Sequence, residues 1–495
     1  MRRAALLASL ASHSTAWLVV DVARDFGARG DNATDNTAAF RAAIAAVAAA
    51  GGGEVIVPAA PPSIFQTGPF NLSTNVLLTV EGTVFAVADA AAFPRVTAPP
   101  SYLSSFPAWR HHPFVWAPNA TNVTIRGGGE INGGGPYWWT GPEKTAETRP
   151  HLLELHNVTG AEVTGVTLHN SAFCASRATP RRARRARNCD PNDPRHPNAQ
   201  TRAPRPTPTG TFRPIYCRDV WIHDMRIENQ YGAGDNLDGI DVDSSQNVLI
   251  ERNYINTGDD HVTVLAGAGA SGRAFNMSSR NVTVRDNVLG TGMGMSVGSS
   301  VSGGVEDVLY ARNVMTEGRY VNASTYGFWG QGSHIKTRVS YGGFIRRISY
   351  VDNVIYAAST QAILVETDYQ SSGGCNATTC TEIRDILWRN MTVLIVGTGA
   401  GNGGPGQIGC YPERPCSNFT FVRLNVHLNV TARCACNCPN PNKPPNPHLT
   451  ARPTTTNQQE DIFINTTARW SCSNLTSITV TNVSPPGLAA ACGLA

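Results

Sequence analysis

A short unit recurs along the chain, and four successive copies read Asp219-Val220-Trp221-Ile222, Asn247-Val248-Leu249-Ile250, Asn281-Val282-Thr283-Val284 and Asp307-Val308-Leu309-Tyr310. Each copy places Asn or Asp, a turn-forming residue, before a β-branched residue and a short strand pattern. The copies begin 28, 34 and 26 residues apart, and periods of roughly 20–50 residues indicate a solenoid. A stack of such units predicts a parallel β-helix. A β-sandwich or a propeller is also possible, although no blade signature accompanies the Gly/Asn punctuation.

The N-terminal part follows another pattern. Residues 37–50 are alanine-rich and predict a helix that Asp35 and Asn36 cap and Gly51-Gly52-Gly53 ends. A strand, Glu54-Val55-Ile56-Val57, follows and stops at a proline. A short helix before a long run of strands suits the end cap of a stack. The sequence therefore predicts an all-β chain, a single-stranded right-handed parallel β-helix with a short N-terminal capping helix.

Three segments do not fit the repeat. Residues 1–18 have a basic end and a short apolar run, which is typical of a signal peptide, and residues 19–495 form the predicted β-helix domain. Within it, residues 175–211 form a basic, proline-rich insertion that we expect to be disordered, because it cannot bury much apolar surface. A proline-rich loop is expected at residues 439–456.

Composition excludes several classes of protein. The 495 residues are 41% hydrophobic and only 15% charged, which argues against disorder and against binding to nucleic acid. No apolar run approaches the roughly 20 residues that a membrane-spanning helix needs. Nine of the 12 cysteines lie beyond residue 370, and their spacing favours disulfides over a zinc site. Together with many Asn-x-Ser/Thr sequons, the cysteines predict a secreted glycoprotein. We expect it to be a monomer.

Acidic residues carry the chemistry. Asp238 and Asp260 are 22 residues apart, about one coil of the predicted helix, and Asp259 adjoins Asp260. Equivalent positions on successive coils lie about 4.7–4.9 Å apart, so we expect the three carboxyl groups to converge. Mutual repulsion would then keep at least one of them protonated. A protonated acid beside an ionised base is what glycoside hydrolysis requires, and carboxyl separations of roughly 6.5–9.5 Å would predict inversion.

The same aspartates allow a plainer interpretation. Aspartates near strand ends commonly cap turns or bind calcium, and each signal alone is weak.

Several motifs together resemble one family. Asp25-Phe26-Gly27-Ala28-Arg29-Gly30-Asp31 and Gly129-Glu130-Ile131-Asn132-Gly133-Gly134-Gly135 resemble N-terminal motifs of the polygalacturonases, glycoside hydrolase family 28. Asn236-Leu237-Asp238 and Gly258-Asp259-Asp260 resemble that family's Asn-Thr-Asp and Gly-Asp-Asp motifs. Outside the basic insertion the resemblance covers nearly the whole chain and is strongest to the plant branch.

The resemblance implies roles for individual residues. Asp259 would be the general acid, and Asp238 and Asp260 would activate the attacking water. The substrate-binding residues would be Asn236, His334, Lys336 and Tyr369. We expect no metal and no cofactor.

Two departures from the family's motifs bear on specificity. The family's Gly-His-Gly turn is Gly292-Met293-Gly294 here, and Met cannot share a proton. The Arg of its Arg-Ile-Lys motif is His334, which lacks the bidentate guanidinium fork. The activity expected is inverting hydrolysis of an acidic cell-wall polysaccharide containing α-linked galacturonic acid (pectin) or, alternatively, a rhamnogalacturonan. The sequence also leaves open a calcium-dependent lyase and a non-catalytic carbohydrate-binding protein.

Overall fold

The computed structural model describes residues 17–139, 148–172, 210–229, 236–316, 332–358, 361–371, 373–396, 404–429, 471–475, 477–484 and 492. The predicted signal peptide up to residue 16, the basic insertion up to residue 209 and the loop 439–456 lie outside these residues.

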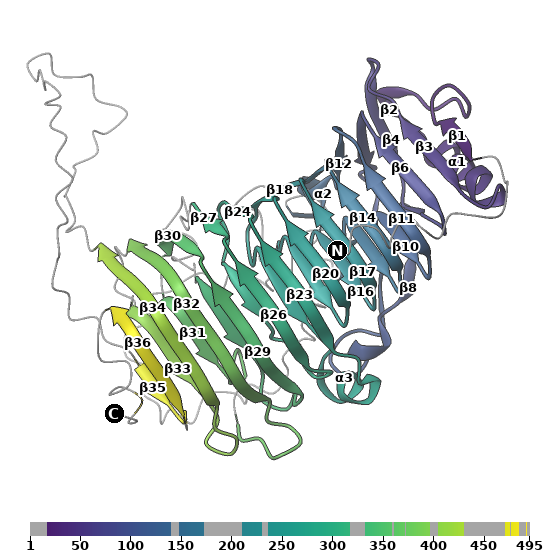
Figure 1. Cartoon of the computed structure of the whole chain (residues 1–495). Helices are drawn as coiled ribbons and strands as arrows, with labels where there is room; N and C mark the ends of the chain where they lie inside the picture. The colour runs from purple at the N-terminus through teal and green to yellow at the C-terminus, as the bar shows by residue number, and fades with distance from the viewer. Residues whose placement is uncertain are drawn as a thin grey trace, which may run out of the picture.

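The described strands wind into a parallel β-helix with three faces around one continuous core (Figure 1). Face 1 consists of β1 (Leu18–Asp21), β3 (Gly53–Val57), β6 (Val76–Val80), β11 (Thr121–Arg126), β14 (Thr159–Thr164), β17 (Arg218–His223), β20 (Gln246–Glu251), β23 (Ser279–Arg285), β26 (Val305–Ala311), β29 (Phe344–Val351), β32 (Glu382–Val396), β34 (Ser417–Asn429) and β36 (Ile478–Ser484). Face 2 consists of β2 (Gly30–Asp35), β4 (Ser63–Thr67), β7 (Thr83–Ala86), β12 (Glu130–Asn132), β15 (Thr167–His169), β18 (Arg226–Glu228), β21 (Tyr254–Asn256), β24 (Val288–Leu289), β27 (Val314–Met315) and β30 (Val354–Ala358). Because the long strand β32 pairs with both β29 and β30, faces 1 and 2 join into one sheet.

Face 3 is a separate sheet, and it carries the candidate site. It consists of β5 (Phe70–Asn71), β10 (Val115–Pro118), β13 (Leu153–His156), β16 (Phe212–Ile215), β19 (Ile240–Asp243), β22 (Val262–Leu265), β25 (Met295–Val297), β28 (Ser333–Lys336), β31 (Gln361–Glu366), β33 (Gly404–Gly409) and β35 (Ser471–Ser473). Side chains alternate along these strands, so that Ile240 and Val242 join the core while Asp241 and Asp243 point outward.

The repeated unit explains the stacking. Val220, Val248, Val282 and Val308 are in register on β17, β20, β23 and β26, which confirms the coil predicted from their spacing. The residue before each valine has a positive φ of 53–59°. Asn and Asp tolerate this left-handed conformation better than other non-glycine residues, which accounts for the recurring Asn or Asp.

Side-chain ladders run through the interior as well. Asn253, Asn287, Asn313 and Asn353 are buried, and each of the first three donates its amide N–H to the next Asn at 2.9–3.0 Å. The rings of Tyr310, Tyr350, Trp388 and Phe421 stack in order, with centroids 4.7–5.9 Å apart. The asparagine ladder gives buried amide groups hydrogen-bond partners on the next coil, and the aromatic ladder packs rings between successive coils. Stability therefore accumulates along the stack.

The predicted capping helix is α1 (Thr37–Ala49), which buries Phe40, Ile44 and Val47 against the first coil. Asp35 accepts a hydrogen bond from the Thr37 backbone N–H at 2.9 Å, as a capping group does. The prediction for Asn36 was wrong, because its side chain makes no cap hydrogen bond to the helix. Its amide instead bonds to backbone groups of Arg29 and Gln66 and ties the preceding loop to β4.

A long excursion, residues 88–113, leaves the coil between β7 and β10 and lies against the outward side of face 3. We call it the covering segment. It contains η1 (Ala90–Ala92), η2 (Pro100–Tyr102) and an antiparallel hairpin of β8 (Arg95–Thr97) and β9 (Trp109–His111). Tyr102 forms a second apolar cluster with Ile215, Tyr216, Ala268 and Tyr341, outside the helix interior. Two further short helices are α2 (Gly135–Trp139) and α3 (Gly269–Phe275).

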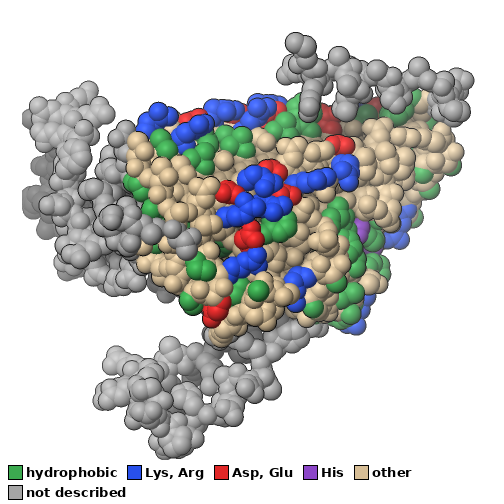
Figure 2. Space-filling model, turned by 60° about the horizontal axis from the view of Figure 1, so that its bottom comes forward, with side chains coloured by type: hydrophobic (Ala, Val, Ile, Leu, Met, Phe, Trp, Pro, Cys, Tyr) green, Lys and Arg blue, Asp and Glu red, His purple; other side chains and the backbone are tan. Residues whose placement is uncertain are grey.

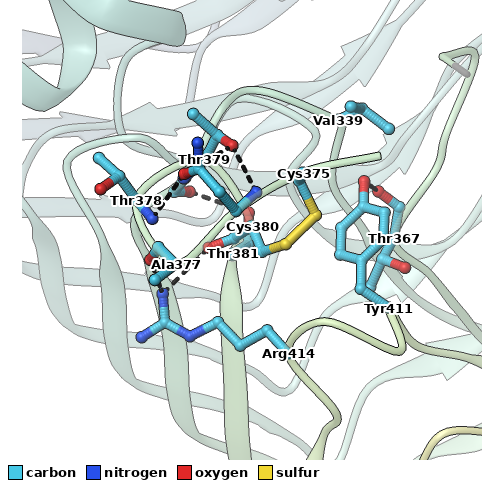
Figure 3. Close-up of a disulfide and its surroundings, with 12 residues drawn as sticks. Val339, Thr367, Cys375, Ala377, Thr378, Thr379, Cys380, Thr381, Tyr411 and Arg414 are labelled. Atoms are coloured by element: carbon cyan, nitrogen blue, oxygen red, sulfur yellow. Dashed lines mark hydrogen bonds between the residues drawn. A yellow bond between two sulfur atoms is a disulfide. The ribbon is translucent and has the colours of Figure 1, made fainter. Parts of the chain in front are cut away.

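Disulfides, which the cysteine spacing favours, are present among the described residues. Cys375–Cys380 and Cys410–Cys416 each close a short loop, and Cys472–Cys492 bridges residues near the C-terminus. Arg414 donates to the carbonyls of Ala377 and Cys380 at 3.0 Å and so holds the first loop in place (Figure 3). Among the described residues, no helix has the length and apolarity needed to cross a membrane.

Candidate active site

The three predicted aspartates converge at the start of two neighbouring strands of face 3. Asp238 precedes β19, and Asp259 and Asp260 precede β22. The Gly239 N–H donates to the Asp260 carbonyl at 2.9 Å, which fixes the two coils in register. One carboxylate oxygen from each aspartate lies within 4.8 Å of the others. These oxygens are closer together than the separation of roughly 6.5–9.5 Å that would by itself predict inversion.

Asp260 is held as a carboxylate. Its Oδ2 accepts a hydrogen bond from the Lys336 ammonium at 2.7 Å, and its Oδ1 accepts one from the Ser296 hydroxyl at 2.6 Å. Burial opposes ionisation, but the Lys336 charge, a smaller effect of His334 and the two hydrogen bonds outweigh it and lower the pKa of Asp260. The buried Lys336–Asp260 pair therefore gives the site one fixed negative charge beside a fixed positive charge.

Asp259 retains its proton to a much higher pH. Burial and the neighbouring Asp260 charge raise the pKa of Asp259 to about 7. Burial also raises the pKa of Asp238 well above its ordinary value, with contributions from Asp241, Asp259 and Asp260. The site thus combines an ionised carboxylate, Asp260, with a carboxylic acid, Asp259, which are the two states that acid–base catalysis needs.

Backbone and amide groups position Asp259. Its Oδ2 accepts from the Asn236 backbone N–H at 3.1 Å and lies 3.5 Å from the Asn236 amide nitrogen. The Met293 N–H donates to the Asp259 carbonyl at 2.7 Å. Asn236, predicted to bind substrate, is thus a direct neighbour of the acidic group, and Met293 contributes its backbone rather than a proton-carrying side chain.

His261 supports the turn that carries Met293. Its Nδ1 accepts from the Gly294 N–H at 3.1 Å, and its Nε2–H donates to the Gly290 carbonyl at 2.9 Å. Burial lowers the pKa of His261 to about 4, so the imidazole is neutral. Because both ring nitrogens are engaged with this turn, His261 holds backbone in place and exchanges no proton with the aspartates.

His334 has a carboxylate partner. It follows Ser296 in register on the next strand and lies 2.7 Å from the Glu366 carboxylate through Nε2. Burial lowers the pKa of His334, although the hydrogen bond and the charge of Glu366 oppose this, and the ring Nε2–H donates to Glu366. Sequence reasoning missed Glu366, whose position opposite the Arg-Ile-Lys equivalent became apparent only from the pairing of β28 with β31.

The ring of Tyr369 lies close to two cationic side chains, those of Lys336 and Arg338. The Lys336 ammonium lies 5.0 Å from the Tyr369 ring centroid, and the Arg338 guanidinium carbon lies 5.8 Å from it. Arg338 Nη2 donates to the Gln370 side chain at 2.9 Å, and Gln370 donates to the Tyr369 hydroxyl at 2.9 Å. Within the described part of the chain Arg338 forms no ion pair, and its buried Nε has no hydrogen-bond partner. Sequence reasoning missed Arg338, although it follows Lys336 by two positions and so lies beside the same strand end.

Asp241 is a further acidic group that sequence reasoning left unused. It is fully buried on β19, and neither carboxyl oxygen has a hydrogen-bond partner among the described residues. Burial raises its pKa well above the ordinary value, although the Arg213 charge opposes this. The alternation of Ile240 and Val242 with Asp241 was the available signal, since it places Asp241 outward beside the three predicted aspartates.

The tryptophan pair and a bound metal ion are two further candidates for a part in the site. Trp138 and Trp139 are buried, and Trp138 packs edge-to-face on Phe93 of the covering segment at 5.7 Å. They are therefore packing residues rather than an open platform for sugar. A metal could use the three aspartate oxygens, but the Lys336 ammonium already lies 2.7 Å from Asp260 and supplies positive charge there.

Comparison with known proteins gives a consistent result. The family model for glycosyl hydrolases family 28 matches residues 61–179 and 205–446. A probable polygalacturonase of Vitis vinifera is 26% identical over 83% of this chain and 74% of its own length. An endo-polygalacturonase of Pectobacterium carotovorum is 24% identical over 69% of this chain and 75% of its own length.

The fold agrees with solved structures. An exopolygalacturonase from Thermotoga maritima superposes with a TM-score of 0.61 and 24% identity, covering 83% of this chain and 92% of that one. The right-handed parallel β-helix predicted from the sequence is confirmed. Because the similar proteins include both an endo- and an exo-enzyme, the mode of cleavage does not follow from this comparison.

Proposed function

This chain belongs to glycosyl hydrolases family 28, and from that premise we propose that it hydrolyses an α-linked, galacturonate-containing polysaccharide by direct attack of water. The observation that carries the proposal is the contrast between two adjacent aspartates. Asp259 holds a proton up to a pH of about 7, while Lys336 and Ser296 keep Asp260 ionised.

Each aspartate has a distinct task in this mechanism. Asp259 donates its proton to the glycosidic oxygen as the bond to the departing sugar breaks. Asp260 accepts a proton from the attacking water, and its negative charge stabilises the positive charge that develops on the sugar. Asp238, whose pKa is raised by burial and by its acidic neighbours, orients the water through a hydrogen bond. This assigns the base to Asp260 first and gives Asp238 the supporting role.

Inversion is the outcome expected of direct attack by water, because no covalent glycosyl-enzyme intermediate forms. The hydrogen bonds that Asp260 accepts from Lys336 and Ser296 hold its carboxylate in place as the base for that water. NMR of the initial product would distinguish the outcomes, since a product with the anomeric configuration of the substrate would exclude this mechanism.

Recognition of the substrate carboxylate is assigned to Arg338, assisted by Lys336. Arg338 forms no ion pair with the described acidic residues and is held between the rings of Tyr369 and Tyr341, each 5.8 Å from its guanidinium carbon. A guanidinium that is already oriented loses little conformational freedom when it binds a carboxylate with two parallel hydrogen bonds.

The decisive experiment compares wild type with Asp259→Asn on polygalacturonate and on rhamnogalacturonan, with release of reducing ends as the readout. We expect wild-type cleavage with and without a chelator, and its loss in the variant. An ultraviolet-absorbing unsaturated product that a chelator abolishes would instead establish a lyase. Substrate binding without any cleavage in wild type would establish a carbohydrate-binding protein.

A second candidate substrate is rhamnogalacturonan, favoured by the His334–Glu366 pair. Glu366 is 26% exposed and brings a negative charge to the site, where it disfavours a second substrate carboxylate and tolerates a neutral sugar. If polygalacturonate is the substrate, Glu366→Gln should lower its KM. If rhamnogalacturonan is the substrate, the same change should leave its KM unaltered or raise it.

The setting of the enzyme completes the proposal. Disulfides persist in oxidising compartments, and three are present among the described residues. We therefore place the enzyme outside the cell or in a cell wall, as a monomeric glycoprotein whose partner is an acidic polysaccharide. Recovery of the protein from a cell-wall wash would test this placement.

A further inference from the structure

We propose that the enzyme attacks its polysaccharide from one chain end, because the covering segment occupies the outward side of face 3 on the N-terminal side of the aspartates. This inference rests on the proposed function and adds the mode of cleavage to it. An enzyme that cuts within a chain needs free surface on both sides of the reacting bond. The outward sides of β13 and β16, which precede the aspartates along the helix, and of β19, which directly follows Asp238, offer no such surface.

The first contact of the covering segment is with β13. Glu154 points outward from β13 and is in register with Arg213 on β16. Arg110 of the covering segment binds both oxygens of Glu154, one of them at 2.6 Å. Arg110 is 2% exposed and Glu154 is not exposed. A sugar crossing β13 along the face would have to displace this buried ion pair, which is strongly unfavourable because it leaves both charges unpaired.

The second contact reaches β16 and β19. The Tyr102 hydroxyl donates to Asp243 at 2.6 Å, and its ring lies 5.1 Å from the Arg213 guanidinium carbon. Arg213 in turn bonds to Asp243 at 2.5 Å, and neither side chain is exposed. Tyr102 therefore lies over the strand that directly follows Asp238, within one coil of the aspartates.

The covering segment is anchored and not merely close. The Ala268 N–H donates to the Ser101 carbonyl at 2.9 Å, and Ser104 and Ser271 exchange hydrogen bonds at 2.7 and 2.9 Å. Its apolar cluster with Ile215 and Tyr216 adds buried contacts. These attachments to β16 and to the loop after β22 hold the segment in place against face 3.

The C-terminal side of the site differs. Glu366 is 26% exposed, Tyr369 is partly exposed, and Asp368 and Gln370 are exposed. The two cations Lys336 and Arg338 also lie on that side, beside Tyr369. A long polymer can therefore extend from the aspartates past Tyr369, while only its terminal units fit between the aspartates and the covering segment.

The products of wild-type enzyme test this directly. On polygalacturonate, or on rhamnogalacturonan if that is the polymer cleaved, we expect only mono- and disaccharides at early times, with little loss of viscosity. A ladder of longer oligosaccharides from the first minutes would overturn the inference and leave the proposed hydrolase intact. Absence of both cleavage and binding would overturn the proposed function and this inference together.

Binding gives a readout that does not need turnover. The Asp259→Asn variant is titrated with oligogalacturonates that carry a bulky group at one end or at the other. We expect one of the two modifications to abolish binding and the other to be tolerated. Equal tolerance of both would show a site open on both sides.

Detaching the covering segment should change the products. Tyr102→Ala combined with Arg110→Ala and Glu154→Ala removes the contacts with β13 and β19 without leaving Glu154 unpaired. Longer oligosaccharides should then appear. Arg95→Ala is the matched control, since Arg95 stacks on Trp109 within the segment at 3.8 Å and is exposed, so its products should match wild type. Should the triple variant fail to fold, the wild-type products and the titration still decide the question.

Discussion

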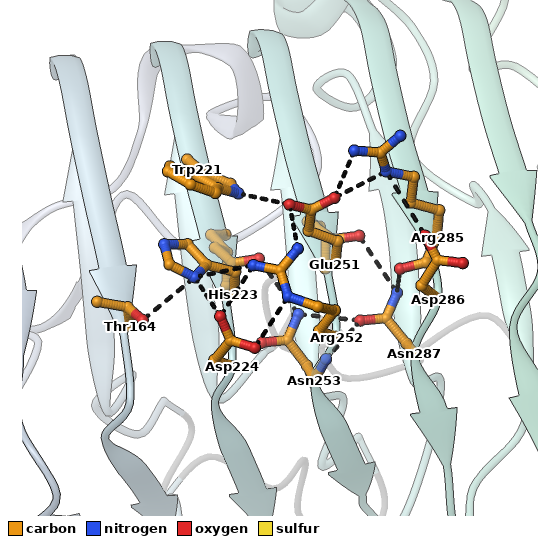
Figure 4. Close-up of polar contacts among 12 residues, drawn as sticks. Thr164, Trp221, His223, Asp224, Glu251, Arg252, Asn253, Arg285, Asp286 and Asn287 are labelled. Atoms are coloured by element: carbon orange, nitrogen blue, oxygen red, sulfur yellow. Dashed lines mark hydrogen bonds and ion pairs between the residues drawn. The ribbon is translucent and has the colours of Figure 1, made fainter. Parts of the chain in front are cut away.

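Acidic side chains at the edge of face 1 and those of the candidate site on face 3 differ in how their charge is compensated. At the edge of face 1, Arg252 pairs with Asp224 and Glu251, and Arg285 pairs with Glu251 (Figure 4). Basic and acidic side chains are intermixed in the same manner on the surface that Figure 2 shows. At the site on face 3, by contrast, the three buried aspartates share the Lys336 charge, and the buried Asp241 beside them faces the Arg213 charge.

The difference shows how acidic residues with a structural role can be told from catalytic ones in a repetitive fold, by the direction in which their pKa is shifted. Hydrogen bonds from Arg252 and Arg312 lower the pKa of Asp224 and Asp286 respectively, so both stay ionised and fully compensated. Burial and like charge instead raise the pKa of Asp259 to about 7. An acid that keeps its proton near neutral pH carries no structural advantage, and such groups concentrate at functional sites.

The largest effect is expected from Asp259→Asn. Loss of the proton donor should reduce kcat by about 10²–10⁴-fold, because the leaving oxygen is then not protonated. Arg252→Ala on face 1 is the control and should retain kcat. Equal kcat values for wild type and Asp259→Asn, with unchanged circular dichroism, would show that Asp259 on face 3 has no more catalytic role than the ion pairs of face 1.

The next effect concerns Lys336→Met and the pH profile. Wild-type kcat/KM should fall above pH 7 as Asp259 loses its proton, and fall in acid as Asp260 gains one. Removing the ammonium removes what lowers the pKa of Asp260, so the acidic limb should move to higher pH by about one unit or more. A profile that only scales down, with its acidic limb unmoved, would mean that Lys336 does not set the charge of Asp260.

Sequence reasoning went furthest where local pattern determines structure. The Asn or Asp at positions 219, 247, 281 and 307 marks a left-handed residue in each coil, so spacing alone predicted the register. The same logic brought Asp238 beside Asp260, one coil later. One carboxyl oxygen of each of the three aspartates lies within 4.8 Å of the others, so their spacing does not by itself predict inversion.

The remainder depends on contacts between distant segments. Lys336 reaches Asp260 across 76 residues, and Tyr102 reaches Asp243 across 141. No local period encodes such pairs, since each depends on where an excursion from the coil returns. The covering segment and Glu366 were for this reason absent from the predicted site. Arg338 was missed although it lies only two positions after Lys336.

A smaller effect is expected on the stability of Asp259→Asn, which should change in the opposite direction to its activity. A carboxyl with a raised folded-state pKa binds more protons folded than unfolded between the unfolded value near 3.8 and the folded value of about 7. Wild-type stability should therefore fall as pH rises through that window. Asn cannot ionise, so the variant should be more stable than wild type at pH 8, by on the order of 1–3 kcal/mol. The stability difference between Asp259→Asn and wild type should thus shift in favour of the variant between pH 4 and pH 8. A shift in favour of wild type would contradict the raised pKa of Asp259.

The smallest effect is expected from Arg312→Ala on face 1. Arg312 binds both oxygens of Asp286 at 2.7 Å, but its side chain is 50% exposed and Asp286 is 37% exposed. Solvent screens such a pair, so we expect a loss of only about 0.2–1 kcal/mol in the free energy of unfolding, with unchanged kcat. Salt of roughly 1 M shortens the screening length to about 3 Å and should reduce the difference from wild type. A loss that salt leaves untouched would assign the contribution of Arg312 to packing of its alkyl chain, and would weaken the view that face 1 carries compensated charge.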